Sequence, residues 1–180
     1  YVIDADDIYG FDKLPFPYVI KPVCGGSSVG VFIINSKEDL LTMRWTYGQK
    51  MLVQEYINGQ ELTVGVLNGE AVAVTEIVPK VRFYDYEVKY SQNMAEHILP
   101  AKISPVVAKK MMKYAEDVYK IFDCRTLVRV DFRYDSLQDR ICILELNTQP
   151  GMTEFSLFPE QASYIGIPFE KLIEVMVNQA

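Results

Sequence analysis

The sequence predicts a mixed α+β fold, because runs with strand character alternate with segments of helical spacing. Hydrophobic residues make up 49% of the 180 residues, which is enough to form a sizeable core. Asn68-Gly69 separates two apolar runs and is typical of a two-residue hairpin turn, since both residues tolerate positive φ. One long amphipathic segment follows Ser104-Pro105, a pair that is typical of a helix N-terminus.

The individual elements follow from the distribution of apolar residues along the chain. Strands are expected at 18–21, 31–35, 51–57, 62–67, 71–77, 126–134 and 140–146, the last two joined by a polar turn at 135–139. Helices are expected at 37–46 with Ser36 as N-cap, at 105–122, near 158–165 and at 168–178. Residues 81–101 show no periodicity, and a connection of this length is usually a lid, a binding loop or a disordered segment.

Composition excludes several classes of function. The net charge is −6 and no long basic run is present, so the sequence argues against nucleic-acid binding. No apolar run approaches the roughly 20 residues of a membrane span. The three cysteines are far apart and lack CxxC spacing, which indicates neither a disulfide framework nor a zinc site and fits a reducing cytoplasm. The chain opens without Met on strand-like residues, so we expect it to be part of a longer protein.

A glycine- and serine-rich loop at 24–30 follows Lys21, with Pro22 and Val23 between them. Such a loop lets backbone N–H groups approach a phosphate, to which Lys21 could add a charge. The order of residues is not that of a Walker loop, and no helix is expected after it. A glycine-rich hairpin turn is an equally good interpretation of this segment.

Two expected strands carry polar side chains in step with the pleat. Arg129 and Asp131 share one face of the first strand, and Glu145 and Asn147 share one face of the second. If the strands pair, two carboxylates, an amide and a guanidinium converge. The oxygen donors suit Mg²⁺, and the guanidinium could hold a carboxylate or phosphoryl oxygen. The alternative is a solvated polar face with an Asp–Arg pair.

Other charged residues are less distinctive. Glu61 could hold a ribose or an ammonium group, although a solvated strand edge is the commoner explanation for such a side chain. His97, the only histidine, has no evident partner in the sequence and is expected at the surface rather than as a base.

Four motifs together resemble a known family. They are Gly26-Ser27-Ser28-Val29-Gly30, Tyr84-Asp85-Tyr86-Glu87-Val88-Lys89-Tyr90, Arg129-Val130-Asp131 and Glu145-Leu146-Asn147-Thr148-Gln149-Pro150-Gly151. In this order they are similar to the D-alanine–D-alanine ligases of the ATP-grasp superfamily, and the resemblance extends over essentially the whole chain.

The resemblance implies an ATP-grasp fold with antiparallel-rich sheets, flanking helices and nucleotide between two subdomains. Residues 1–57 would be the later part of the central domain and 58–180 the C-terminal domain, with the family's N-terminal substrate domain absent. The implied reaction phosphorylates one D-alanine with ATP and joins it to a second for cytoplasmic peptidoglycan precursor synthesis. The resemblance leaves open a homodimer of the full-length protein, and we expect the 180 residues alone to be inactive.

The resemblance also implies roles for individual residues. For ATP, Lys21 and Lys89 would contact phosphates, Tyr56 and Ile57 would line the adenine pocket, Glu61 would hold the ribose, and Gln54 stands where the family usually has an acidic residue. Two Mg²⁺ ions, with Mn²⁺ as an alternative, would bind Asp131, Glu145 and Asn147. Arg129 and Gly151 would stabilise the acyl phosphate and tetrahedral intermediate, and Ser27, Tyr90, Ser156 and Leu157 would position the D-alanines.

Two alternatives remain open. One is a ligase that joins D-alanine to D-lactate or D-serine, although Tyr90 after Lys89 favours the D-alanine dipeptide. The other is a nucleotide-binding module that has lost its chemistry. The presence of Lys21, Lys89 and the four polar residues on the two paired strands argues against such a loss.

Overall fold

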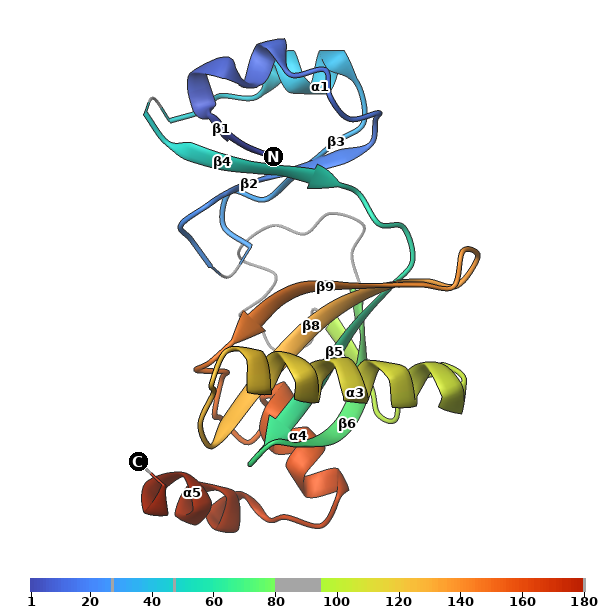
Figure 1. The fold of residues 1–180 in the computed structure, drawn as a ribbon, viewed down its shortest axis with the longest axis vertical. Coiled ribbons are helices and arrows are strands. Elements are labelled where there is room, and N and C mark those ends of the chain that lie inside the picture. The colour runs from blue at the N-terminus through green and yellow to red at the C-terminus, as the bar shows by residue number, and fades with distance from the viewer. Residues whose placement is uncertain (27, 47, 80–94, 180) are drawn as a thin grey trace. The chain divides into compact units, whose positions relative to one another are not determined.

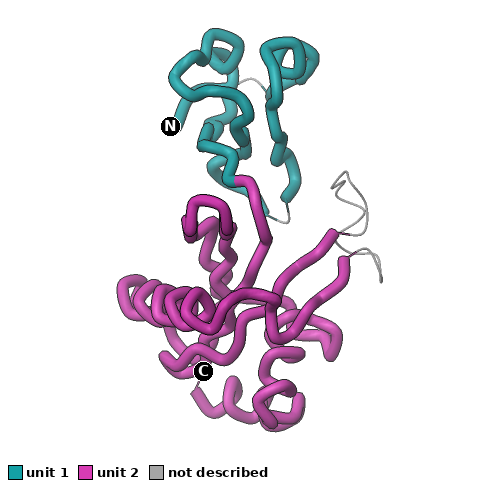
Figure 2. The backbone as a smooth tube through the Cα atoms, turned by 90° about the vertical axis from the view of Figure 1, so that its right-hand side faces the viewer, with its two compact units in different colours: residues 1–57, 83–92 teal, residues 58–82, 93–180 magenta. Residues whose placement is uncertain are grey.

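The computed structural model describes residues 1–26, 28–46, 48–79 and 95–179. Among them, Tyr1–Ile57 form one compact unit and the residues from Asn58 onward form a second, called unit 1 and unit 2 below (Figure 2). Every strand pairing in these residues is antiparallel, as expected for the predicted α+β class. None of the helices among them is long and apolar enough to cross a membrane.

Unit 1 is built on a four-stranded sheet in the order β1-β4-β2-β3 (Figure 1). Its elements are β1 (Val2–Asp4), a 3₁₀ helix η1 (Ala5–Gly10), β2 (Tyr18–Pro22), β3 (Phe32–Ile34), α1 (Lys37–Thr42) and β4 (Lys50–Glu55). Ser36 caps α1 as predicted, its Oγ accepting from the Asp39 amide at 3.2 Å. The helix ends at Thr42 rather than at 46, because Met43 already has an extended backbone.

Alternate residues of these strands form the core of unit 1. Tyr18 and Ile20 of β2 are buried, as are Met51 and Val53 of β4. Val19 lies opposite Gln54 and Lys21 lies opposite Leu52. Since successive side chains of a strand point to opposite faces, Lys21 and Gln54 lie on the sheet face away from this core.

Unit 2 is built on a five-stranded sheet in the order β7-β6-β5-β8-β9. Its elements are β5 (Gln60–Leu67), β6 (Glu70–Pro79), β7 (Ala95–Ile98), α3 (Pro105–Ile121), β8 (Leu127–Asp135), β9 (Arg140–Asn147), α4 (Leu157–Tyr164) and α5 (Phe169–Asn178). The predicted Asn68-Gly69 hairpin joins β5 to β6, with φ of 52° at Asn68 and 86° at Gly69.

Strand β7 is a correction to the sequence analysis, which expected no regular structure at 81–101. Its four residues pair with the end of β6, from Glu76↔Ile98 to Pro79↔Ala95. The segment Ala-Glu-His-Ile has no run of β-branched residues, so its strand conformation depends on this pairing at the sheet edge. Residues 81–94 of the expected lid lie outside the described residues.

Helices cover both faces of the unit 2 sheet. Figure 1 shows α3 lying across one face, where Val64, Val130 and Phe132 share a buried cluster with Met111 of α3. On the other face Leu127 shares a cluster with Phe158 of α4 and with α5. Because side chains alternate along β8, Arg129 and Asp131 lie on the same face as Leu127 and α4.

Candidate active site

The polar side chains predicted to converge on β8 and β9 do so. The two strands pair so that Arg129 lies opposite Asn147 and Asp131 lies opposite Glu145. Directly opposite residues in an antiparallel pair have Cβ atoms about 4.5–5.5 Å apart on one face of the sheet. The four residues therefore form one polar patch, which we call the β8–β9 patch.

Asp131 is the centre of this patch. Its Oδ1 accepts from Arg129 Nε at 2.8 Å and from Thr63 Oγ1 at 2.6 Å. Its Oδ2 accepts from Arg129 Nη2 at 2.9 Å and from Asn147 Nδ2 at 2.9 Å. An ionised carboxylate offers about four acceptor sites, so these four donors occupy the whole of its capacity.

The guanidinium of Arg129 is held in its charged form by the patch. Burial opposes the charge and by itself lowers the pKa of Arg129, whose side chain is 19% exposed. The hydrogen bonds to Asp131 and the negative charges of Asp131, Glu145 and Glu61 outweigh burial and raise the pKa above its ordinary value. Arg129 is therefore a permanent cation, fixed bidentately beside two carboxylates.

The carboxylate and amide oxygens of the patch are of the chemical type that binds a hard divalent cation. Asp131 and Glu145 contribute carboxylates from neighbouring strands, and Asn147 turns its amide nitrogen to Asp131, which leaves its amide oxygen as an acceptor. No group of three His, Cys, Asp or Glu side chains in the described part of the chain is suited to a metal. A metal at Asp131 must therefore use the amide, substrate oxygens or water, and must displace one of the four donors.

Glu61, predicted to hold a ribose, lies on β5 of unit 2 beside a second arginine. It pairs in register with Arg133, and its Oε2 lies 3.6 Å from Arg133 Nη1. Both side chains are partly buried, at 27% and 19% exposure. The carboxylate of Glu61 is thus oriented by a neighbouring cation.

The structure brings together Gly151 and Ser156, which the sequence separates by four residues. A Cβ added to Gly151 would lie 2.9 Å from Ser156 Oγ, so any other residue at 151 would require the Ser156 hydroxyl to move. Ser156 Oγ also accepts from the Thr153 amide at 3.0 Å. Ser156 is the N-cap residue of α4 and Leu157 is its first residue, so two predicted substrate residues lie at the start of this helix.

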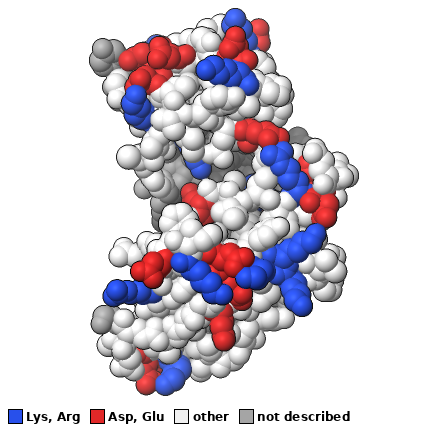
Figure 3. All heavy atoms as spheres, viewed as in Figure 1, with Lys and Arg blue, Asp and Glu red and all other residues white. Residues whose placement is uncertain are grey.

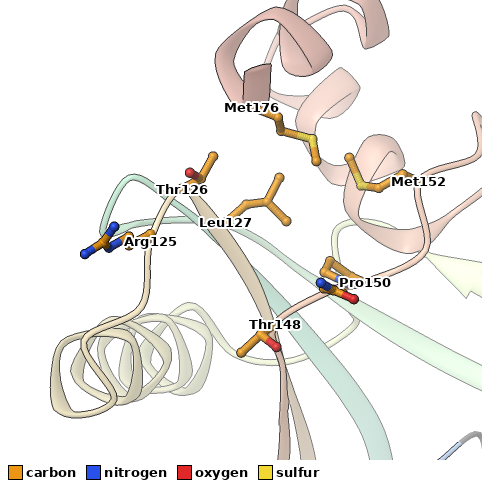
Figure 4. Close-up of a pocket in the computed structure, with 8 residues that line it drawn as sticks. Arg125, Thr126, Leu127, Thr148, Pro150, Met152 and Met176 are labelled. Carbon is orange, nitrogen blue, oxygen red and sulfur yellow. The ribbon is translucent and has the colours of Figure 1, made fainter. Parts of the chain in front are cut away.

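A cavity of about 390 Å³ lies next to this loop. Its lining residues are Arg125, Thr126, Leu127, Thr148, Gln149, Pro150, Met152 and Met176. In Figure 4 Leu127, Met152 and Met176 point toward one another, whereas the guanidinium of Arg125 points away from them. No residue of the β8–β9 patch is among the lining residues, so the cavity is distinct from the predicted metal ligands.

In unit 1 the predicted nucleotide residues lie on and after β4. The Oε1 atom of Gln54 is buried and has no hydrogen-bond partner among the described residues. Tyr56 and Ile57 follow β4 directly, and Lys21 lies on the neighbouring strand β2. Three further predicted site residues, Ser27, Lys89 and Tyr90, lie outside the described residues.

His97 has a partner that the sequence did not reveal. Its Nδ1 lies 2.8 Å from Glu160 Oε2, which links β7 to the first turn of α4. Sequence reasoning found no partner for His97, because the two residues are 63 positions apart.

Two residues that support the site, one directly and one through β5, were missed by sequence reasoning. Thr63 donates to Asp131, and its alternation with Glu61 along β5 was a signal that could have placed it on the same face. Gln161 of α4 is fully buried and contacts β5 and β6, but its position in a short amphipathic helix carries no signal for that contact.

Acidic and basic side chains are intermixed on the visible face of unit 2, along the helix α3 (Figure 3). Lys113 and Asp117, one turn apart on α3, form such a pair. This intermixing does not resemble the continuous positive surface of a nucleic-acid-binding protein.

Comparisons with known proteins agree with the resemblance carried by the motifs. A family model described as "D-ala D-ala ligase C-terminus" matches residues 9–178. The chain is 48% identical, over 189 residues, to the D-alanine–D-alanine ligase of Rhodopseudomonas palustris strain BisA53. This match covers 99% of this chain and 60% of that protein. The chain spans about 60% of the length of the curated relatives it matches.

Two solved structures support the fold. One is the D-alanine–D-alanine ligase from Bacillus anthracis complexed with ATP, with a TM-score of 0.75 and 26% identity over 99% of this chain and 59% of that chain. The other is the VanG D-Ala:D-Ser ligase from Enterococcus faecalis, with a TM-score of 0.81 and 27% identity over 98% of this chain and 55% of that chain. The predicted fold class is confirmed by these likenesses.

Proposed function

Because this chain belongs to the family of D-alanine–D-alanine ligase C-terminal regions, we propose that it is the nucleotide- and metal-binding part of an ATP-dependent ligase. The complete enzyme would phosphorylate the carboxylate of one D-alanine and couple it to the amine of a second. The dipeptide would serve peptidoglycan precursor synthesis in the cytoplasm. We propose that residues 1–57 belong to the central domain and 58–180 to the C-terminal domain.

The observation that carries this proposal is the β8–β9 patch. Phosphoryl transfer and attack on an acyl phosphate both develop negative charge on oxygen, and positioned cations stabilise that charge. Arg129 provides a permanent, partly buried cation for this purpose. The backbone amide of Gly151 would donate to the same oxygens, from a loop in which Gly151 lies close to Ser156.

Asp131, Glu145 and Asn147 would hold the Mg²⁺ ions of the ATP complex. A bound divalent cation would neutralise phosphate charge and orient the transferred group. Because Asp131 already accepts four hydrogen bonds, its ligation of a metal requires one of these donors to leave, and Arg129 is the donor that phosphoryl oxygens would attract. The released guanidinium would then be available to the phosphoryl oxygens.

The nucleotide would be held by Lys21, Gln54, Tyr56, Ile57, Glu61 and Lys89. Gln54 supports this assignment, because an orphaned buried amide oxygen is costly unless a ligand satisfies it. The amino group of adenine is a donor of the required kind. Ser27, Tyr90, Ser156 and Leu157 would position the two D-alanines.

The test is phosphate release from ATP by the complete gene product that contains this chain. We expect release that depends on both Mg²⁺ and D-alanine, with D-alanyl-D-alanine as the product. D-lactate or D-serine is then added as the second substrate at equal concentration. If phosphate release with D-lactate or D-serine is as fast as with D-alanine, the proposed D-alanine dipeptide is replaced as product by a depsipeptide or a mixed dipeptide. If the protein binds nucleotide but releases no phosphate, it is a non-catalytic module.

A further inference from the structure

We propose that Thr63 is a positioning residue for the Asp131 carboxylate, and that Gln161 of α4 holds Thr63 in place. The inference rests on the proposed function, because it concerns the carboxylate assigned there to the metal. Thr63 lies directly opposite Asp131 in the β5–β8 pairing and is fully buried. Its hydroxyl donates to Asp131 Oδ1 at 2.6 Å, within the range of strong hydrogen bonds to a carboxylate.

Thr63 differs from the other donors to Asp131 in its strand and in its burial. Arg129 and Asn147 lie on the β8–β9 patch itself and have proposed roles toward phosphate and metal. Thr63 is on a different strand and is shielded from solvent, so substrate cannot draw its hydroxyl away. It remains attached to Asp131 when Arg129 leaves, and it therefore fixes the carboxylate orientation at the moment a metal is bound.

Gln161 holds the segment of β5 that carries Thr63. The β5–β6 register shifts between Val64 and Val66, so Gly65 has no partner residue on β6. The Gly65 amide instead donates to Gln161 Oε1 at 2.7 Å. Gln161 Nε2 donates to the Thr63 carbonyl at 3.2 Å and to Thr75 Oγ1 at 2.9 Å.

The fit around this side chain is close. A Cβ on Gly65 would lie 2.5 Å from Gln161 Oε1 and 2.9 Å from the Phe158 ring, so the bulge requires glycine. Gln161 and Phe158 belong to the helix that begins just after Ser156. The hydrogen bonds of Gln161 therefore hold Thr63 next to Asp131, the proposed metal ligand. They also attach α4, which begins near Gly151, to the sheet.

The experiment compares Thr63→Val with Thr63→Ser in the complete gene product. Mn²⁺ is titrated against protein saturated with the non-hydrolysable nucleotide AMP-PNP, and free Mn²⁺ is followed by electron paramagnetic resonance. Valine has the shape of threonine without its hydroxyl, so we expect Mn²⁺ affinity to fall about 10- to 100-fold, the usual effect of removing an outer-shell partner of a ligand. Serine keeps the hydroxyl and should restore most of the affinity.

Thr75→Val is the matched control. Thr75 lies opposite Thr63 on β6, is equally buried and contacts Gln161, but it has no hydrogen bond to Asp131. The proposal expects lower stability and unchanged Mn²⁺ affinity for this variant. If Thr63→Val and Thr75→Val change the affinity equally, Thr63 has only a structural role and the proposal is overturned.

Two further variants make every outcome decisive. If Thr63→Val does not fold, Thr63→Ala replaces it, with the same expected loss relative to Thr63→Ser. Asp131→Asn tests the premise separately: if it leaves Mn²⁺ affinity unchanged, the metal assignment of the proposed function fails. If Asp131→Asn abolishes binding while Thr63→Val leaves it intact, only the positioning role of Thr63 is refuted.

Discussion

Gly59 lies between the predicted adenine residue Ile57 and the predicted ribose residue Glu61, and it permits a backbone approach that no other residue allows. Its φ is +129°, and a Cβ at this position would lie 2.0 Å from the Tyr134 carbonyl oxygen and 3.0 Å from Asp135 Cα. These neighbours are backbone atoms, so they cannot move aside as a flexible side chain would. Gly59→Ala must therefore shift the start of β5 or the end of β8.

The cost of this substitution has two parts. A side chain in a sparsely populated backbone region costs on the order of 1–3 kcal/mol. Forcing an extra carbon into a filled space costs about 1–3 kcal/mol more. We therefore expect Gly59→Ala to lower the free energy of unfolding by roughly 2–6 kcal/mol, a large share of the 5–15 kcal/mol of a typical domain.

Two other glycines separate these contributions. Gly166 has a φ of +86° and no heavy atom within 4 Å of an added Cβ, so Gly166→Ala should show only the backbone cost, about 1–2 kcal/mol. Gly10 has neither a positive φ nor a neighbour within 4 Å, so Gly10→Ala should be nearly neutral.

The assay is urea unfolding followed by circular dichroism at 222 nm, which in the described residues reports mainly on the three longer helices of unit 2. Unfolding free energies of Gly59→Ala and Gly166→Ala, both in unit 2, are compared with that of the unchanged protein. Gly10→Ala lies in unit 1 and is followed by the fluorescence of Trp45 in the same urea series. If Gly59→Ala costs no more than Gly166→Ala, the contact with Tyr134 is not a constraint and the reasoning is refuted.

Two further predictions concern the buried side chain of Gln161 and the half-buried side chain of Asp39. Gln161→Leu should lower the unfolding free energy of unit 2 by about 1–3 kcal/mol in the same urea experiment, because the buried Gly65 amide loses its acceptor; a loss below about 0.5 kcal/mol would contradict the role of this side chain. The backbone and side-chain amides of Asn35 donate to Asp39 and, with smaller contributions from Ser36, lower the pKa of Asp39 below its ordinary value of 3.8. A depressed folded-state pKa stabilises unit 1 above about pH 3.8, and this stabilisation is lost as the pH falls through the folded value. We therefore expect the stability of unit 1 to fall less steeply below pH 4 in Asp39→Asn than in the unchanged protein. The measurement is the fluorescence of Trp45, the single tryptophan, during unfolding at each pH. Identical pH profiles for the two proteins would exclude the effect.

Much of unit 2 was predictable because its elements have strong local signals. Ser104-Pro105 begins α3 as expected, and the Asn68-Gly69 turn joins β5 to β6. The pleat alone predicted that Arg129 and Asp131 share a face, and the turn at 135–139 brought β9 alongside them. Strand β7 was missed because its residues have little intrinsic strand preference and depend on pairing with β6.

The sequence by itself determined the family, the fold class and the identity of the four polar residues on β8 and β9, since period-two alternation and motif order are local properties of the chain. Only the tertiary structure decided what those residues contact. Thr63 is 68 positions from Asp131, and Gln161 is 96 positions from Gly65. Hydrogen bonds over such separations depend on strand register, a bulge and the packing of α4 on the sheet, and these are set by burial of the whole unit rather than by neighbours in sequence.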